Sequence, residues 1–322
     1  YLKKYPNGNY ANLAFFELGR YRFIKKDFLK CIVSLRKVDV KSLTDSQRNS
    51  YYFRLGYSYF IEEKYQEAQL AFYELEGVKF SFSDLVNYCV AHMNYIQGNY
   101  ASALNSFYKL SDVPSLGRIS KFYITHIYYF QSRYGELIEY AEPLLDTTNT
   151  DRNTELFRLV ADAHYNLGEH EESIQNFEKY AELGELNLNR LENYQLAYSY
   201  TQLKDYESAV SFFEKVLVED DSLSQFASYH LGATYLELDD KAFALNSFKY
   251  ASSLTFDLKL QEDAFFNYVK LVYDVENTYN NSVTAFKQFL DKYPDSDNSI
   301  TVRNLLVRAY AYSRDYDSAL NF

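Results

Sequence analysis

Hydrophobic residues recur along this chain with the spacing of one helix face. Residues at i, i+3, i+4 and i+7 lie on the same side of an α-helix. One such stripe is formed by Tyr52, Leu55, Gly56 and Tyr59, and the next by Ala68, Phe72 and Leu75. A short polar segment separates the two stripes. The pattern predicts two helices joined by a turn, packed closely where the small residues meet.

This helix pair repeats along the whole chain. The second helix of each pair reads aromatic residue, two polar residues, a small residue, three further residues and then an apolar residue, often Phe. The small-residue position falls at Cys31, Ala68, Ala103, Leu137, Ser173, Ala209, Ala244, Ser282 and Ala319. Successive positions differ by 34 to 38 residues, which is the period of a tandem helical repeat. We therefore predict an all-α fold of about nine helix-turn-helix units.

The first helices resemble those of the tetratricopeptide repeat (TPR) family. The family pattern of aromatic, Leu, Gly and aromatic residues is matched by Tyr52, Leu55, Gly56 and Tyr59, and in part by Leu231, Gly232 and Tyr235. In other units Ala replaces the Gly, and the family's usual Trp is absent. The resemblance covers essentially the whole chain. It implies a right-handed α-solenoid, or superhelix, of about nine TPR-like units, in which each unit is stabilised by its neighbours.

We expect residues 1–322 to form one solenoid with an irregularity near residues 143–151. Pro143 falls within the second helix of the fourth unit, where it removes a backbone donor and should kink or shorten that helix. The polar, turn-prone stretch 146–151 follows. It indicates either a hinge between two halves of the chain or a longer loop within one continuous superhelix. The unbroken period favours the loop.

Both ends of the chain look like truncated repeats. The segment Lys4-Tyr5-Pro6-Asn7 mirrors Lys292-Tyr293-Pro294-Asp295, which follows 288 residues later. The N-terminus therefore resembles the tail of a preceding repeat. Residues 316–322 stop midway through a second helix. We expect the chain to be a fragment of a longer repeat protein.

Composition and charge narrow the possible functions. Gly and Pro make up only 14 of 322 residues, too few for an all-β fold or a low-complexity linker. The 33 Lys and Arg against 44 Asp and Glu give a net charge of −11, which disfavours a nucleic-acid partner. Cys31 and Cys89 lack a zinc or disulfide spacing. No apolar stretch approaches 18 residues, so we expect no direct membrane insertion.

No group of residues points to catalysis. The sequence contains no HExxH, GxSxG, GxGxxG or Walker-type motif. His92 and His126 occupy equivalent positions in adjacent units, but a shared metal ion would need third and fourth ligands for which the sequence offers no candidates. Acidic clusters fall in turns, where such residues act as solubility and capping charges. We predict no enzyme activity, no cofactor and no metal site.

The TPR resemblance implies a concave groove lined by aromatic side chains. In that family, the residues that follow the first aromatic, the Gly and the second aromatic of each first helix face the groove. Carried over position by position, the partner-binding residues are Phe16, Phe23, Phe53, Tyr57, Phe60, Tyr88, His92, Tyr95, Phe122, His126, Tyr129, Tyr165, Tyr194 and Tyr198. The alternative is that adjacent first helices pack these rings against one another and leave no open groove.

These features favour a protein-interaction scaffold that binds a peptide or a partner helix in an aromatic groove. One alternative is a cell-envelope assembly or secretion component, because the segment Tyr293-Pro294-Asp295-Ser296 is also familiar from TPR proteins of bacterial envelopes. That likeness favours a periplasmic or cell-envelope location over a cytoplasmic one. Another alternative is a glycan- or peptidoglycan-binding module, since aromatic rings also stack on sugars. Fold alone does not decide among these functions.

Overall fold

The structure is a computed structural model that describes residues 1–5, 7–145, 151–184, 187–275 and 279–320. Within these ranges the chain contains α-helices and short 3-10 helices and no β-strand. Each odd-numbered α-helix packs against the even-numbered helix that follows it, from the pair α1 and α2 to the pair α17 and α18. The all-α solenoid of nine helix pairs predicted from the repeat period is therefore confirmed.

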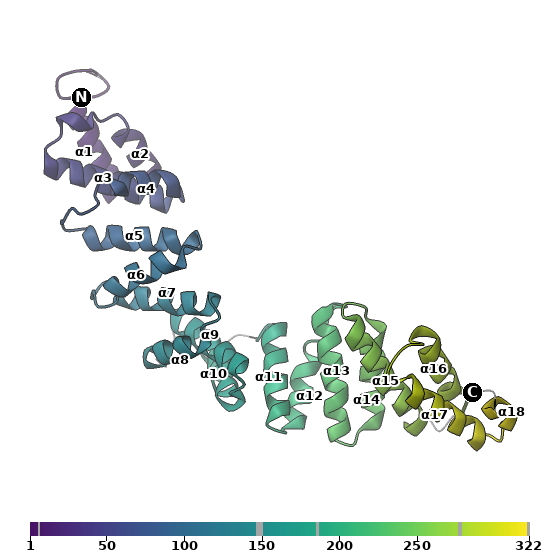
Figure 1. Cartoon of the computed structure of the whole chain (residues 1–322). Helices are drawn as coiled ribbons and strands as arrows, with labels where there is room; N and C mark the ends of the chain where they lie inside the picture. Colours follow the sequence, from purple (N-terminus) through teal and green to yellow (C-terminus); the bar gives the residue numbers. More distant parts are fainter. Residues whose placement is uncertain (6, 146–150, 185–186, 276–278, 321–322) are drawn as a thin grey trace. The chain divides into compact units, whose positions relative to one another are not determined.

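The chain forms two compact units, which are described separately. Unit 1 spans Tyr1–Ala141 and unit 2 spans Glu142–Phe322. The helices of unit 1 are α1 (Ala11–Ile24), α2 (Phe28–Leu35), η1 (Val40–Ser42), α3 (Asp45–Ile61), α4 (Tyr65–Tyr73), α5 (Ser83–Ile96), α6 (Tyr100–Leu110), α7 (Gly117–Phe130) and α8 (Tyr134–Ala141). Within the unit they follow one another in chain order (Figure 1).

Unit 2 repeats the same arrangement of helix pairs (Figure 1). Its helices are η2 (Glu142–Leu144), α9 (Asp151–Leu167), α10 (His170–Gly184), α11 (Arg190–Gln202), α12 (Tyr206–Glu214), α13 (Ser222–Glu237), α14 (Lys241–Ser253), α15 (Leu258–Val275), α16 (Tyr279–Lys292), α17 (Ser299–Tyr312) and α18 (Tyr316–Leu320). None of the described helices is both long enough and apolar enough to span a bilayer.

Small residues let the two helices of a pair approach. A Cβ atom added to Gly56 would lie 2.7 Å from the ring of Phe72, and one added to Gly232 would lie 3.0 Å from Phe248. Real Cβ contacts are almost never that short, so the Phe of the second helix fills the space left by the Gly. Ala68 on the facing helix is fully buried. The sequence pattern and the packing therefore agree at this contact.

In every helix pair whose turn lies within the described residues, the turn has a residue in the left-handed conformation. It lies five residues before the small-residue position, and its φ is between 54° and 78°. The residues concerned are Lys26, Glu63, Gly98, Ser132, Gly168, Lys204, Asp239 and Arg314. This conformation reverses the chain direction within two or three residues and directs the second helix back along the first.

Pro143 lies just after the fourth second helix, α8, which at 8 residues is as long as α2. Helix α8 ends at Ala141, and Pro143 lies in the 3-10 turn η2. The boundary between the two units falls at the same place. The predicted hinge or loop at 146–150, Pro6 of the N-terminal tail and the last two residues, 321–322, lie outside the described residues.

Candidate functional site

The predicted partner-binding residues lie on the first helices of the pairs. In unit 1 they come from α1, α3, α5 and α7, and in unit 2 from α9 and α11. Twelve of the fourteen are half-buried. Phe16 and Phe53 are each only 2% exposed, so these two rings belong to the core and offer no surface to a partner. The prediction for them is corrected: the ring of Phe53 stacks on Phe82, with centroids 4.4 Å apart.

The remaining rings of unit 1 form contacts from one first helix to the next. Phe23 lies 5.6 Å from Tyr57, measured between ring centroids. Phe60 lies 5.5 Å from His92 in an edge-to-face arrangement, which is a favourable geometry for aromatic pairs. A further contact, of 6.5 Å, joins Tyr95 to His126. Adjacent first helices therefore do pack their rings together, and the rings are half-buried, with part of each still accessible. We call this surface the aromatic face.

Sequence reasoning missed the residues that reach back to the preceding first helix. Tyr123 of α7 lies 4.9 Å from Tyr95 and 5.0 Å from His92, both on α5. Likewise, the Arg54 guanidinium of α3 lies 5.6 Å from the ring centroid of Phe23 on α1. These residues directly precede the Leu-type position of their helices. This position in the repeat could have identified them from the sequence, because it lies next to the groove position on the helix surface.

The aromatic residue that begins several second helices also contacts the rings of the aromatic face. Tyr65 at the start of α4 lies 6.1 Å from Phe60. Tyr100 at the start of α6 stacks on Phe130, with centroids 5.8 Å apart and planes at 7°. The repeated aromatic residue that opens the second helix thus supports the rings of the first helix. From the sequence, this aromatic residue is identified only as part of the repeat pattern.

In unit 2 the corresponding surface is more polar. Tyr165 and Tyr198 do meet, at 5.9 Å, and Tyr194 lies 6.1 Å from His230. In addition, Gln195 donates a buried hydrogen bond to the Asp162 carboxylate. Ring contacts therefore continue from α9 through α11 to α13, because Tyr198 also lies 5.4 Å from His230, and unit 2 adds a buried polar pair to them.

The pKa shifts of the titratable rings favour their neutral forms. Burial lowers the pKa of His92, so its imidazole is neutral near pH 7. Burial also raises the pKa of Tyr57, and it raises the pKa of Tyr165 to about 12, so these hydroxyls stay protonated. Among the described residues, no three His, Cys, Asp or Glu side chains lie close enough together to hold a metal ion. The surface is suited to contact by apolar and aromatic groups.

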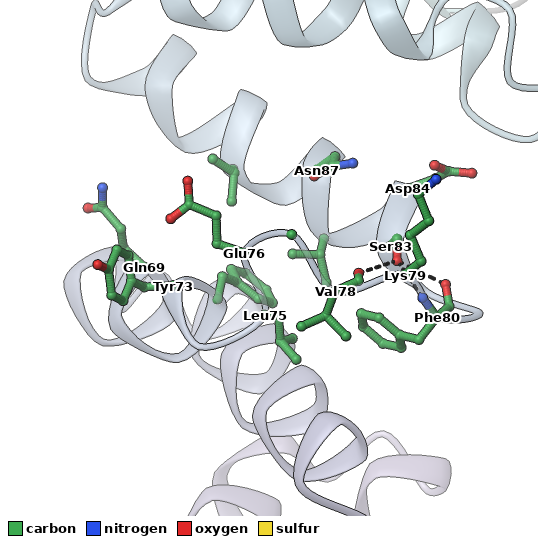
Figure 2. A pocket seen from close by; sticks show the side chains of 14 residues that line it. Gln69, Tyr73, Leu75, Glu76, Val78, Lys79, Phe80, Ser83, Asp84 and Asn87 are labelled. Atoms are coloured by element: carbon green, nitrogen blue, oxygen red, sulfur yellow. Dashed lines mark hydrogen bonds between the residues drawn. The ribbon is translucent and has the colours of Figure 1, made fainter. Parts of the chain in front are cut away.

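A separate cavity of about 750 Å³ lies between α4 and α5 (Figure 2). Leu75, Val78 and Phe80 of the connecting loop line it, and Tyr73 stands at its edge. The Ser83 hydroxyl is occupied by the backbone, because it donates to the Val78 carbonyl at 3.0 Å and accepts from the Phe80 amide at 2.9 Å. Ser83 therefore fixes the loop and is not placed as a nucleophile.

Comparison with known proteins gave matches to repeat proteins. Residues 193–217 match the family model described as "Tetratricopeptide repeat". No curated protein matches the chain. Among solved structures, the C-terminal part of a TPR repeat-containing protein from Cytophaga hutchinsonii is 17% identical, with a TM-score of 0.51, over 89% of this chain and 98% of that one.

Two other solved structures cover about half of the chain. A MamA protein is 16% identical with a TM-score of 0.45, over 54% of this chain and 92% of its own. YrrB, entitled a TPR protein with an unusual peptide-binding site, is 19% identical with a TM-score of 0.42, over 58% of this chain and 87% of its own. At these identities the likeness concerns the fold.

Proposed function

We propose that this chain, whose residues 193–217 match the tetratricopeptide-repeat model, is a non-enzymatic scaffold that holds a protein partner on the aromatic face of unit 1. The partner segment lies across the first helices α1, α3, α5 and α7. The proposed contact does not include Tyr165, Tyr194 and Tyr198, which belong to unit 2. We propose no catalytic step and no cofactor for this surface.

One observation carries the proposal: half-buried rings follow one another across four consecutive first helices. Tyr and Phe provide large contact areas with few rotatable bonds, so little side-chain entropy is lost when a partner binds. Because the rings are already held by their neighbours, part of that entropy is lost on folding, before the partner arrives. A pre-ordered aromatic surface favours a peptide or helix with apolar side chains.

A cell-envelope location is supported only by the sequence likeness of one segment to TPR proteins of bacterial envelopes. The Tyr293-Pro294-Asp295-Ser296 segment has a structural role, because the Ser299 hydroxyl that opens α17 donates to the Tyr293 carbonyl at 2.9 Å. The Tyr293 hydroxyl in turn donates to Gln261 at 3.2 Å. These contacts fix the connection between two helix pairs and contain nothing specific to a compartment.

The test compares three forms of the chain in affinity capture from lysate and envelope fractions, followed by mass spectrometry. Tyr57→Leu with Tyr95→Leu removes two rings from the aromatic face of unit 1 and keeps apolar volume. Tyr165→Leu with Tyr198→Leu is the matched control in unit 2. We expect a protein that is retained by the wild type and the control but lost by the unit 1 variant.

Circular dichroism and thermal melting establish that both variants are folded before their captures are compared. Equal retention by all three folded forms would place the partner away from the aromatic face and would contradict the proposal. Retention of glycans in place of proteins, lost in the unit 1 variant, would favour the alternative of a sugar-binding module.

A further inference from the structure

The cavity between α4 and α5 lies at the one polar exception to the repeat pattern. The residue that follows the small-residue position of each second helix is aliphatic in eight of the nine helix pairs. These aliphatic residues are Ile32, Leu104, Ile138, Ile174, Val210, Leu245, Val283 and Leu320. Three of them, Ile32, Leu104 and Leu245, are only 6–8% exposed. In α4 the residue is Gln69, which is exposed and lines the cavity.

The Leu-type position of α5 is uncovered at the same place. This position lies 13 residues before the small-residue position and holds Val90, which lines the cavity and is half-buried. The equivalent residues Ile124, Leu196 and Leu306 are at most 1% exposed. An apolar surface that is covered in other helix pairs therefore borders a cavity of about 750 Å³ here. A cavity of this size is typical of small-molecule sites, and an apolar group is the complement of its apolar walls.

The wall formed by the loop 74–82 is held in place by its own contacts. The Ser83 hydroxyl donates to the Val78 carbonyl at 3.0 Å. At the end of the loop, the ring of Phe82 stacks on Phe53, with centroids 4.4 Å apart. The cavity is therefore formed before a ligand arrives, and little further ordering of the loop opposes binding.

The cavity lies on the side of α5 that is turned away from the aromatic face. Successive residues of an α-helix are about 100° apart around its axis. Val90 of the cavity and His92 of the aromatic face are thus about 200° apart. The same holds for Val86 and Tyr88. A ligand in the cavity leaves the aromatic face free, so this site is separate from the one proposed to hold a protein partner.

Polar groups on one side of the cavity indicate the charge of its ligand. Figure 2 shows Gln69, Tyr73 and Glu76 on that side. Tyr73 is 71% exposed, so its ring is accessible. A carboxylate and an aromatic ring at the border of an apolar site suit an ammonium group. Among the charged side chains that line the cavity, Glu76 and Asp84 outnumber Lys79.

We propose that the cavity between α4 and α5 binds a small amphipathic cation. Its aliphatic chain lies against Val90 and the other apolar walls, in the place that the aliphatic residue of the second helix occupies in the other helix pairs. Its ammonium group lies on the side formed by Tyr73 and Glu76.

The test titrates the whole chain with three defined probes by isothermal titration calorimetry, each below its micelle-forming concentration. We expect n-octylammonium to bind at one site with a Kd of about 1 mM or tighter. n-Hexylammonium lacks two CH₂ groups, and each contributes roughly a factor of four, so it should bind about 15-fold more weakly. Octanoate should bind at least about tenfold more weakly than octylammonium, because its carboxylate is repelled by Glu76.

The matched protein variants fill the cavity with a ring. Asn87 lines the cavity, and the equivalent residues of α9 and α15 are Phe157 and Phe266, so the repeat accepts Phe at this position. We expect Asn87→Phe to lose about tenfold or more in affinity for octylammonium, and Val90→Phe to do the same from a second position. Asn105→Phe is the control, since Asn105 of α6 is exposed and does not line the cavity; its affinity should stay unchanged.

Glu76→Gln tests the position of the charged group. We expect it to weaken octylammonium about threefold or more and to leave the binding of 1-octanol unchanged, because only the first has a charge to lose contact with. Circular dichroism and thermal melting establish that each variant is folded before its affinity is compared.

Several results would overturn the proposal. If the wild type shows no saturable binding of octylammonium up to about 1 mM, the cavity takes no such ligand. Undiminished binding by folded Asn87→Phe and Val90→Phe would place the ligand elsewhere on the chain. Octanoate that binds as tightly as octylammonium would show that the ligand is not a cation.

Discussion

At one repeated contact the two units use different chemistry. In unit 1 the Tyr128 hydroxyl of α7 bonds to the Tyr108 hydroxyl of the preceding second helix. In unit 2 the equivalent Tyr235 of α13 donates to a carboxylate, with 3.0 Å between its oxygen and Glu214 Oε1. Both bonds join a first helix to the second helix before it. The repeat therefore fixes where the two side chains meet, and the identity of the second residue is free to differ.

The outer surfaces of the two units also differ in charge and polarity. Residues 1–141 contain 18 Lys and Arg and 13 Asp and Glu, a net charge of +5, whereas residues 142–322 contain 15 Lys and Arg and 31 Asp and Glu, a net charge of −16. The first helices of unit 1 all end in exposed apolar residues, whereas in unit 2 helices α11 and α13 end in the exposed polar residues Gln202 and Glu237. One scaffold thus carries an apolar, weakly basic surface and a strongly acidic one, which differ in the partners they suit.

The largest expected effects concern the core, where the two units should behave alike. Phe107 and Phe213 occupy the same position of α6 and α12, and neither is exposed. We expect Phe107→Ala and Phe213→Ala each to lower the free energy of unfolding of its unit by about 3–5 kcal/mol, because each leaves a cavity. Urea denaturation followed by circular dichroism measures the loss. A loss below about 1 kcal/mol at either site would show that the two cores are not equivalent.

A smaller effect is specific to unit 2 and depends on pH. The Asp221 carboxylate accepts from Arg190 Nη1 at 2.7 Å and from Nη2 at 2.9 Å, and these bonds lower its pKa from 3.8 to about 2. A lowered carboxyl pKa stabilises the folded state above about pH 4, and that stability is lost as the pH falls toward 2. Because the pair is partly exposed, we expect about 1 kcal/mol.

The measurement compares wild type with Asp221→Asn in denaturation experiments at several pH values. Asn still caps α13 through its side-chain oxygen, as Asp221 does for the Ser224 amide at 2.8 Å. The variant should therefore be less stable at pH 7 and approach the wild type near pH 2. A difference that persists unchanged at pH 2 would mean that the charge of Asp221 is not its source.

The smallest effects test the contrast between the two tyrosine contacts. Tyr235→Phe and Tyr128→Phe each remove one hydroxyl, and we expect a loss of about 0.5–1.5 kcal/mol in both cases. Only the Tyr235 bond has a charged acceptor, so its loss should shrink in 1 M salt while the loss at Tyr128 should not. Thermal melting at low and high salt measures this. Equal salt dependence at both sites would remove the proposed contrast.

The repeat pattern predicted the core well because it depends on contacts within one helix pair. The close packing of Gly56 against Phe72 follows from helix periodicity alone. The left-handed turn residues were not predicted, because only two of the eight are Gly. In the other six turns a Lys, Glu, Ser, Asp or Arg adopts that conformation, so residue type gives no signal.

The aromatic face was predicted only in part, because its geometry depends on contacts between successive pairs. The sequence does not state how far one first helix is displaced from the next. For that reason Phe53 was placed on the surface, although the ring of Phe82 from the following loop covers it. For the same reason Tyr123 was missed, although it contacts two of the predicted residues. The neighbours across the interface between helix pairs decide which of these rings are buried.

The left-handed turn residues are positions at which substitution by Gly can raise the stability of the repeat protein. A side chain at positive φ costs about 1 kcal/mol relative to Gly, which already occupies this place at Gly98 and Gly168. The remaining turn positions are Lys26, Glu63, Ser132, Lys204, Asp239 and Arg314. A Gly substitution at each of these positions should raise the thermal stability of one repeat, without changing a ring of the aromatic face.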